Sequence, residues 1–148
     1  GRRGCAQASG NLTASANVLQ PLSVSGTEDL DFGSVFPGVS STVLPSDVSA
    51  GRFDIGGENN AEIDINFTLP TTLDGAASTT IPISFGTTSA AWVAGGGPFP
   101  FDPNTGTTQN LDAGSMIVFL GGTVDPAFDQ AAGLYTNTVT MTVAYTGN

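Results

Sequence analysis

Glycine and proline interrupt this sequence so often that no long regular element is expected. The 148 residues include 20 Gly and 9 Pro, which favour turns and the ends of strands. Between these interruptions apolar and polar residues alternate, most clearly over residues 61–69, where Ile63, Ile65 and Phe67 share one face. No segment of ten or more residues has a helical period. The pattern predicts many short strands, each with one face on a core and one in water.

The fold class expected from this pattern is all-β, as an immunoglobulin-like (pilin-like) antiparallel sandwich of about eight or nine strands. Residues 1–11 are polar and are expected to form a flexible N-terminal extension, and residues 12–148 a single sandwich domain. Gly56–Asn60 is predicted to be a hairpin turn between the strands on either side of it. The other strands are expected near residues 12–18, 22–24, 30–33, 39–44, 52–55, 79–85, 116–120 and 135–145. The core-facing set is predicted to include Ile63, Ile65, Phe67, Ile81, Ile83, Val139, Met141 and Val143.

The charge of the chain is strongly negative and limits its partners. Thirteen acidic residues face only Arg2, Arg3 and Arg52, which gives a formal net charge of −10. Such a surface repels phosphate backbones and anionic lipid headgroups, so nucleic acid is not an expected partner. No apolar run approaches the ~20 residues needed to cross a bilayer, so membrane insertion is not expected either.

The N-terminal residues resemble the end of a secretory signal. Cys5 is the only cysteine, so no intramolecular disulfide is expected. In the segment Cys5–Ala8, Ala6 and Ala8 occupy the small-residue positions of a signal cleavage site, and cleavage after Ala8 is one candidate start of the mature protein. Cys5 is interpreted as an incidental or signal-derived thiol, with an intermolecular disulfide as the alternative. These observations predict a secreted protein.

Several short motifs carry a resemblance to a known family. Arg52–Gly57 precedes an alternating strand, and Gly121–Val124 with Asp129–Tyr135 precedes a Thr/Val-alternating C-terminal strand. Together with residues 16–33, these motifs resemble a family of secreted bacterial domains of unassigned function, whose members are similar to spore coat protein U and common-pilus-type subunits. The resemblance spans roughly residues 14–148. Its motifs mark turns and corners, and none of them marks a catalytic site.

The resemblance implies an immunoglobulin-like sandwich, export, and assembly at the bacterial cell surface. Pilus subunits of this general shape polymerise by lending an extended N-terminal strand to the next subunit. The candidate donor in this chain is residues 12–18, because this segment alternates and Gly10 and Pro21 flank it. The residues expected to face the neighbour are Leu12, Ala14, Ala16 and Val18. In the competing interpretation, the same residues are the first strand of their own sandwich.

Catalytic and metal-binding chemistry receives little support from the sequence. The chain has no His, which removes most triads and zinc sites. Glu62 with Asp64, or Asp29 with Asp31, could form a carboxylate pair that acts on glycosides, but a strand alternating like residues 61–69 puts Glu62 and Asp64 on a solvated face. The same residues, or Asp102–Asn104 with Asp112, could offer oxygen ligands to Ca²⁺, without the spacing of a known loop. No cofactor, no metal and no enzymatic activity are therefore expected.

One aromatic group suggests an alternative role. Trp92, Phe99 and Phe101 could form a platform that stacks on sugar rings, or they could belong to the core and close one end of the sandwich. The leading hypothesis is a structural subunit of an extracellular filament, pilus or coat, whose partners are copies of itself in a head-to-tail homopolymer. The alternative is a monomeric surface adhesin or carbohydrate-binding module that contacts a glycan or host surface through these aromatic residues.

Overall fold

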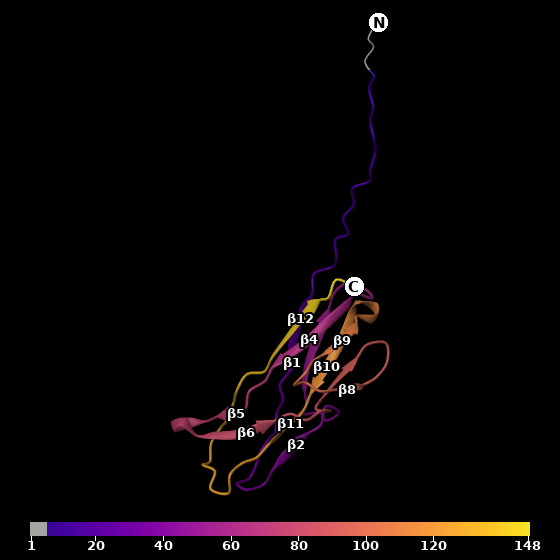
Figure 1. The fold of residues 1–148 in the computed structure, drawn as a ribbon. Helices are drawn as coiled ribbons and strands as arrows, with labels where there is room; N and C mark the ends of the chain where they lie inside the picture. Colours follow the sequence, from indigo (N-terminus) through magenta and orange to yellow (C-terminus); the bar gives the residue numbers. More distant parts are fainter. Residues whose placement is uncertain (1–5) are drawn as a thin grey trace.

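The protein folds as an all-β structure with an extended N-terminal segment. The computed structural model describes residues 6–148, and these residues form twelve strands and two short 3-10 turns, η1 (Ala76–Ser78) and η2 (Asp112–Gly114) (Figure 1). The strand count over this range is higher than the eight or nine expected, because several strands of three or four residues lie in segments that were expected to be loops. The strands are β1 (Ser23–Glu28), β2 (Ser41–Val43), β3 (Gly51–Gly56), β4 (Glu62–Thr68), β5 (Thr72–Asp74), β6 (Thr80–Ser84), β7 (Ala90–Val93), β8 (Phe99–Phe101), β9 (Thr107–Asn110), β10 (Ser115–Leu120), β11 (Gly122–Val124) and β12 (Thr140–Tyr145).

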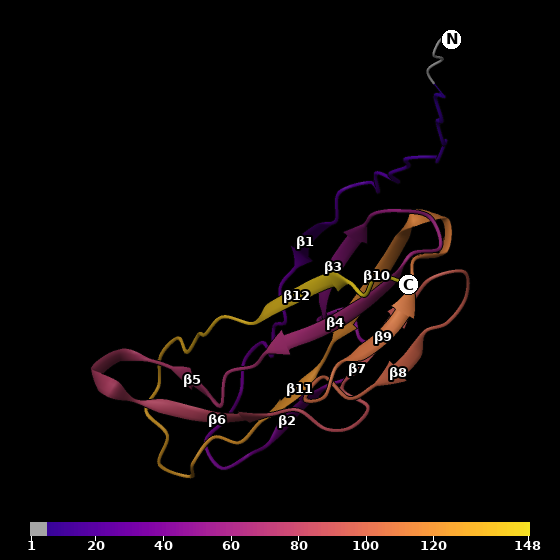
Figure 2. The ribbon, with the colours of Figure 1, turned by 45° about the horizontal axis from the view of Figure 1, so that its top comes forward.

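The strands form three antiparallel sheets. The five-stranded sheet has the order β1-β3-β10-β7-β8, the four-stranded sheet β2-β11-β6-β5, and the three-stranded sheet β12-β4-β9. Figure 2 shows the three-stranded sheet lying across the five-stranded one, with the four-stranded sheet at the end of the molecule away from the N-terminal segment. No helix in residues 6–148 is long and apolar enough to pass through a bilayer.

The alternation in the sequence correctly predicts which faces are buried. In β4, Ile63 and Ile65 are fully buried while Asn66 on the other face is exposed. The same holds for β6, where Ile81 and Ile83 are buried between exposed neighbours. Of the eight residues predicted to face the core, five are buried and Phe67, Val139 and Val143 are half-buried against the core cluster.

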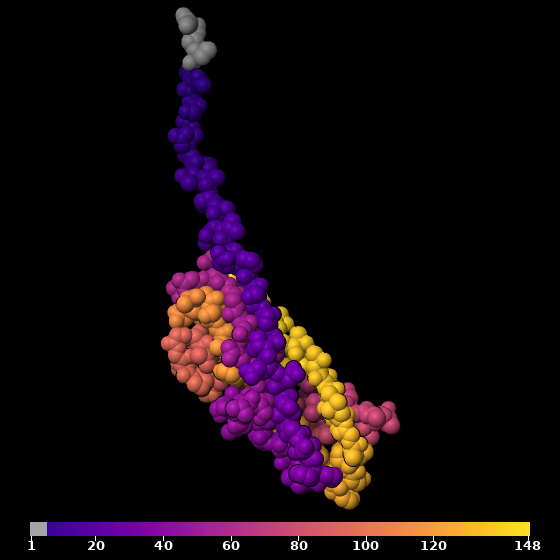
Figure 3. All heavy atoms as spheres, turned by 180° about the vertical axis from the view of Figure 1, so that it is seen from behind, coloured from indigo at the N-terminus to yellow at the C-terminus, as the bar shows by residue number. Residues whose placement is uncertain are grey.

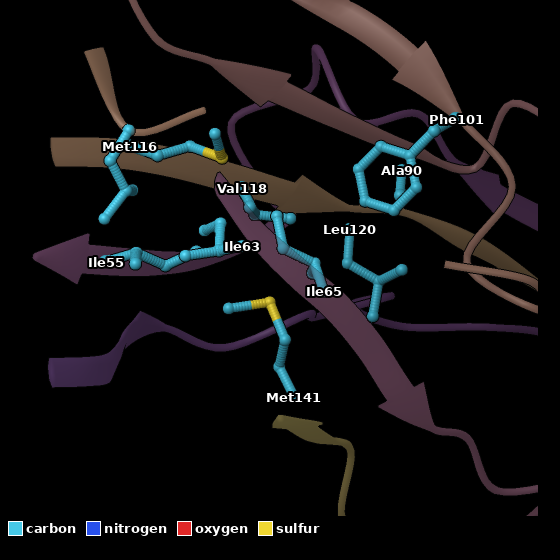
Figure 4. Close-up of a cluster of buried hydrophobic side chains, with 10 residues drawn as sticks. Ile55, Ile63, Ile65, Ala90, Phe101, Met116, Val118, Leu120 and Met141 are labelled. Atoms are coloured by element: carbon cyan, nitrogen blue, oxygen red, sulfur yellow. The ribbon is translucent and has the colours of Figure 1, made fainter. Parts of the chain in front are cut away.

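The main core lies between the five-stranded and three-stranded sheets. Figure 4 shows Ile63 and Ile65 from β4 meeting Met116, Val118 and Leu120 from β10, with other side chains of both sheets around them. Fully burying one large aliphatic side chain stabilises the fold by roughly 1.5–3 kcal/mol. A second, smaller cluster lies in the four-stranded sheet and comprises Ile81, Ile83 and Val124, with Phe32, Val35, Leu73, Phe85 and Tyr135 packed against it.

The hairpin turn expected at Gly56–Asn60 and the strand expected at residues 30–33 are absent, because pairing depends on partners far away in sequence. Gly56–Asn60 is not a hairpin turn, since β3 pairs with β1 and β10 whereas β4 pairs with β12 and β9. The connection instead carries the chain from one sheet to the other. Residues 30–33 form no strand, although they alternate, and in this region β1 begins at Ser23 and ends at Glu28.

Gly121 allows the chain to pass from β10 into β11, and so from one sheet into another. Its N–H donates to the Ser89 carbonyl at 2.7 Å. A Cβ at this position would lie 2.0 Å from the carbonyl oxygen of Val43. Backbone atoms of a paired strand cannot withdraw as a flexible side chain can, so only glycine fits here without a shift of β2.

We expect Gly121→Ala to lower the free energy of unfolding by about 3 kcal/mol, near the upper end of the cost of overpacking a core. Gly10→Ala is the matched control, because no atom lies within 4 Å of a Cβ built at Gly10. Urea unfolding followed by circular dichroism measures both midpoints. Equal midpoints for the two variants would show that β2 moves aside at little cost.

Candidate functional site

An N-terminal arm extends away from the domain. We define this arm as residues 6–19, all of which are exposed and outside any strand (Figure 1). The predicted donor residues lie within it: Leu12 and Val18 are 88% and 89% exposed, and Ala14 and Ala16 are exposed as well. Residues 12–18 therefore do not form the first strand of their own sheet in this structure. Cys5 lies outside the described residues.

A groove of about 830 Å³ runs along the half of the domain away from the arm. We call its two sides the flanks: the first is residues 29–37 and the second is residues 131–139. In Figure 3 the indigo-to-purple segment that follows the arm and the yellow C-terminal segment run side by side down the molecule, and these segments include the flanks. The lining side chains are mainly apolar, and they include Leu30, Phe32, Val35, Leu73, Ile81, Ile83, Val124, Leu134, Tyr135 and Val139.

Neither flank is a strand, and much of the backbone of both is unpaired. In the described chain, the main-chain groups of Phe32, Ser34 and Val35 on the first flank make no hydrogen bond with another backbone group. The same is true of Leu134 and Tyr135 on the second flank. Unpaired N–H and C=O groups beside an apolar floor are the features of an open sheet edge, which can pair with an added strand.

The flanks are tied to their surroundings on the sides away from each other. On the first flank, the Asp31 N–H donates to the Ser49 carbonyl at 3.0 Å. On the second flank, Thr136 exchanges two backbone hydrogen bonds with Asp74 of β5, at 2.8 and 2.9 Å. Just beyond the first flank, the Gly38 N–H donates to the carbonyls of residues 126 and 127. These hydrogen bonds attach both flanks to neighbouring parts of the chain.

The comparison with known proteins identifies the family of this domain. Residues 37–145, well over half of the chain, match the family described as "Domain of unknown function (DUF4402)". The chain belongs to the DUF4402 family. No curated protein matches the sequence significantly. The matched segment contains the second flank and most of the groove floor, whereas the arm, β1 and nearly all of the first flank precede it.

The aromatic residues of the DUF4402 domain do not form one exposed platform. Phe101 is buried and stacks on Phe67, with ring centroids 6.2 Å apart, so its face is not available to a ligand. Trp92 is half-buried, and Phe99 is 44% exposed. Their centroids are 4.6 Å apart, because β7 and β8 pair these two residues directly. Of the three aromatic residues predicted to bind sugar, only Trp92 and Phe99 reach the surface.

The carboxylates of the predicted pairs bond to different hydroxyl or backbone groups. Glu62 accepts from the Thr146 hydroxyl at 2.7 Å, while Asp64 accepts from the Thr108 hydroxyl at 2.5 Å on the opposite neighbouring strand. Asp31 accepts from the Gly33 N–H at 2.8 Å and, with Asp29, lies at the rim of the groove.

Asp102 and Asn104 bond to each other within one turn, in which the Asp102 carboxylate accepts from Asn104. Asp112 lies in η2. Among residues 6–148, no group of three acidic, His or Cys side chains is arranged to hold a metal ion.

Sequence reasoning missed the groove itself. One signal pointed to it: alternation begins at Tyr135, whereas pairing of β12 with β4 begins only at Thr140. The alternating residues before Thr140 line the groove instead of joining the three-stranded sheet.

Proposed function

We propose that this DUF4402 domain is a structural subunit of an extracellular filament, pilus or surface coat, and that it polymerises by donating residues 12–18 to the groove of the next copy. The observation that carries the proposal is that the molecule has both a segment that could be donated and a groove that could receive it. An exposed, alternating arm leaves one end, and an apolar groove with two unpaired flanks lies in the other half. A donated strand gives the unpaired backbone groups hydrogen-bond partners and covers the apolar floor.

The fold that supports this role is, in the proposal, an immunoglobulin-like (pilin-like) sandwich. Two of the three sheets facing each other across the main core are consistent with it. The groove lies beside this core, where the flanks leave room for one further strand. In this interpretation the domain becomes a complete sandwich only after it receives the arm of a neighbour.

The charge distribution favours docking of the arm. The protein carries a net charge of −10, yet no charged residue occurs between Ala6 and Thr27. The arm therefore enters an apolar groove without burying a charge, which costs several kcal/mol when no partner is present. It also escapes the repulsion that keeps the acidic bodies of the subunits apart.

Donation between identical subunits makes a heterologous contact, which propagates as an open filament unless the rotation between subunits closes a ring. The partners are then further copies of this chain, and the role is structural and not enzymatic. Secretion to the bacterial surface belongs to the same proposal, and the signal-like segment before Ser9 and the resemblance to surface subunits support it.

Deletion of residues 1–18 tests the proposal. We expect the shortened domain to fold, because residues 6–18 are all exposed and lie outside every strand. It should remain monomeric in size-exclusion chromatography and negative-stain microscopy. A peptide of residues 11–19 should bind this monomer, measured by fluorescence anisotropy. Deletion of residues 1–10 is the control and should still polymerise. A shortened domain that unfolds, or that does not bind the peptide, would falsify donation.

The Trp92–Phe99 pair keeps a second function open, that of a monomeric surface module that binds glycans. Its partly exposed rings lie on the edge strand β8 and on β7, beside loop residues 94–98. A native protein that is monodisperse, and whose glycan binding is lost in Trp92→Ala, would favour this role over the filament.

A further inference from the structure

The root of the arm is fastened to the domain at Gln20. Its N–H donates to Glu58 Oε1 at 3.1 Å, and its carbonyl accepts from the Tyr145 hydroxyl at 2.5 Å. The Glu58 N–H in turn donates to the Tyr145 hydroxyl oxygen at 2.8 Å. Both main-chain polar groups of Gln20 are therefore bound by the end of β12 and by the connection between β3 and β4. We call these three residues the root clamp.

Close packing supports the root clamp from below. A Cβ built at Gly57 would lie 2.8 Å from Leu22, from Leu111 and from the Tyr145 hydroxyl. Leu111 is fully buried in the main core, and Leu22 and Tyr145 pack against it. The chain at residues 20–22 is therefore fixed to the rigid end of the domain.

The root clamp decides the direction in which the arm leaves. After it, β1 starts at Ser23 and runs toward the groove, whose lining begins at Gly26. Before it, the arm leaves from the end of the domain that carries the C-terminus, away from the groove (Figures 1 and 3). To enter its own groove, the chain would have to reverse direction at residues 19–22, where the clamp holds it.

Length alone does not prevent self-insertion. Ala14 and Leu12 precede Gln20 by six and eight residues, which span up to about 20 and 26 Å when extended. This half of the donor segment can therefore fold back as far as Gly26, six residues beyond Gln20, where the lining of the groove begins. A tethered segment also has an effective concentration of roughly millimolar for its own binding site. Without a geometric block, an arm that fits the groove of a neighbour would fill its own groove first, and the subunit would stay a closed monomer.

We propose that the root clamp of Gln20, Glu58 and Tyr145 prevents self-insertion and directs the arm to a second copy of this chain. This inference rests on the proposed strand donation. Tyr145 and Glu58 are positioning residues, because they act on the direction of the arm and touch neither the arm beyond its root nor the groove.

Tyr145→Phe tests the inference, because it removes the hydroxyl and keeps the ring. After refolding at low protein concentration, we expect about a tenfold rise in the ratio of closed monomer to polymer, because the hydrogen bond that holds the Gln20 carbonyl no longer opposes the reversal. The closed monomer should not bind the fluorescent peptide of residues 11–19. Thr146→Val is the matched control, since its hydroxyl bonds to Glu62 at the same end of the domain but not to Gln20.

A second variant leaves every folded residue unchanged. In this variant, four Gly/Ser residues are inserted between Leu19 and Gln20, so that the arm can turn back while the clamp stays intact. We expect it to form closed monomers that do not bind the peptide. Tyr145→Phe protein that polymerises like the wild type, or whose monomers bind the peptide like the shortened domain, overturns the clamp. Failure of strand donation is visible separately, as a shortened wild-type domain that does not bind the peptide.

Discussion

Ile65→Asp should leave the chain unfolded, whereas Asp64→Ser should cost less than about 1 kcal/mol of stability. Ile65 is fully buried in the middle of β4, between two sheets. The substitution removes a burial worth roughly 1.5–3 kcal/mol and adds a carboxylate whose desolvation costs several kcal/mol more. The sum approaches the whole stability of a typical domain, about 5–15 kcal/mol.

Asp64 is the neighbouring residue and points the other way. It is half-buried, and its main contact is the hydrogen bond from the Thr108 hydroxyl. A serine at this position loses that bond and no apolar burial. Circular dichroism and urea unfolding of both variants provide the measurement. Equal stability of the two variants would mean that the face of β4 that carries Ile65 does not pack against the core.

The sequence predicts the burial of individual strands well because each strand carries its own signal. In β4, β6 and β12 the apolar side chains recur at every second position, and a strand with one face on the core must bury such a set together. In β10 the apolar run over residues 116–120 is continuous and shows no alternation. Met116, Val118 and Leu120 are buried, and the two residues between them are half-buried on the outer face.

The arrangement of strands cannot be read in the same way. Gly56–Asn60 has the composition of a hairpin turn, yet the strands on its two sides belong to different sheets. Each strand edge can pair with several others, and the choice depends on which partner buries the larger apolar surface. That comparison involves residues such as Met116 and Met141, which lie far away in the sequence.

The arm and β1 show how pairing overrides local pattern. Residues 12–18 alternate more regularly than Ser23–Glu28, whose only large apolar residue is Val24. Nevertheless β1 is the segment that pairs with β3, shortly after Gln20, whose carbonyl accepts from the Tyr145 hydroxyl. The groove had only a weak local signal, the alternation that begins at Tyr135, ahead of the pairing of β12 with β4 from Thr140.

Ala16→Asp should abolish polymerisation, whereas Ser15→Asp should leave it nearly intact. In a donated strand, side chains alternate between the groove floor and solvent. Leu12, Ala14, Ala16 and Val18 are the face proposed to enter the groove, so an aspartate at position 16 would be buried against partly exposed apolar side chains of the groove lining, such as Phe32 and Val139. Burying an unpaired carboxylate costs several kcal/mol, which weakens binding by at least about 100-fold, at about 1.4 kcal/mol for each factor of ten.

The two substitutions form a matched pair because both sites are exposed in the monomer and adjacent in the chain. Each adds one negative charge to an uncharged arm of an acidic protein, so general repulsion between subunits rises equally in both. Neither substitution changes the folded domain, so a loss of assembly cannot come from unfolding. Polymer length by negative stain, and binding of the two variant peptides to the domain lacking residues 1–18, measure the difference. Equal loss in both variants would refute the alternating insertion of the arm, and no loss in either would show that residues 12–18 do not enter the groove.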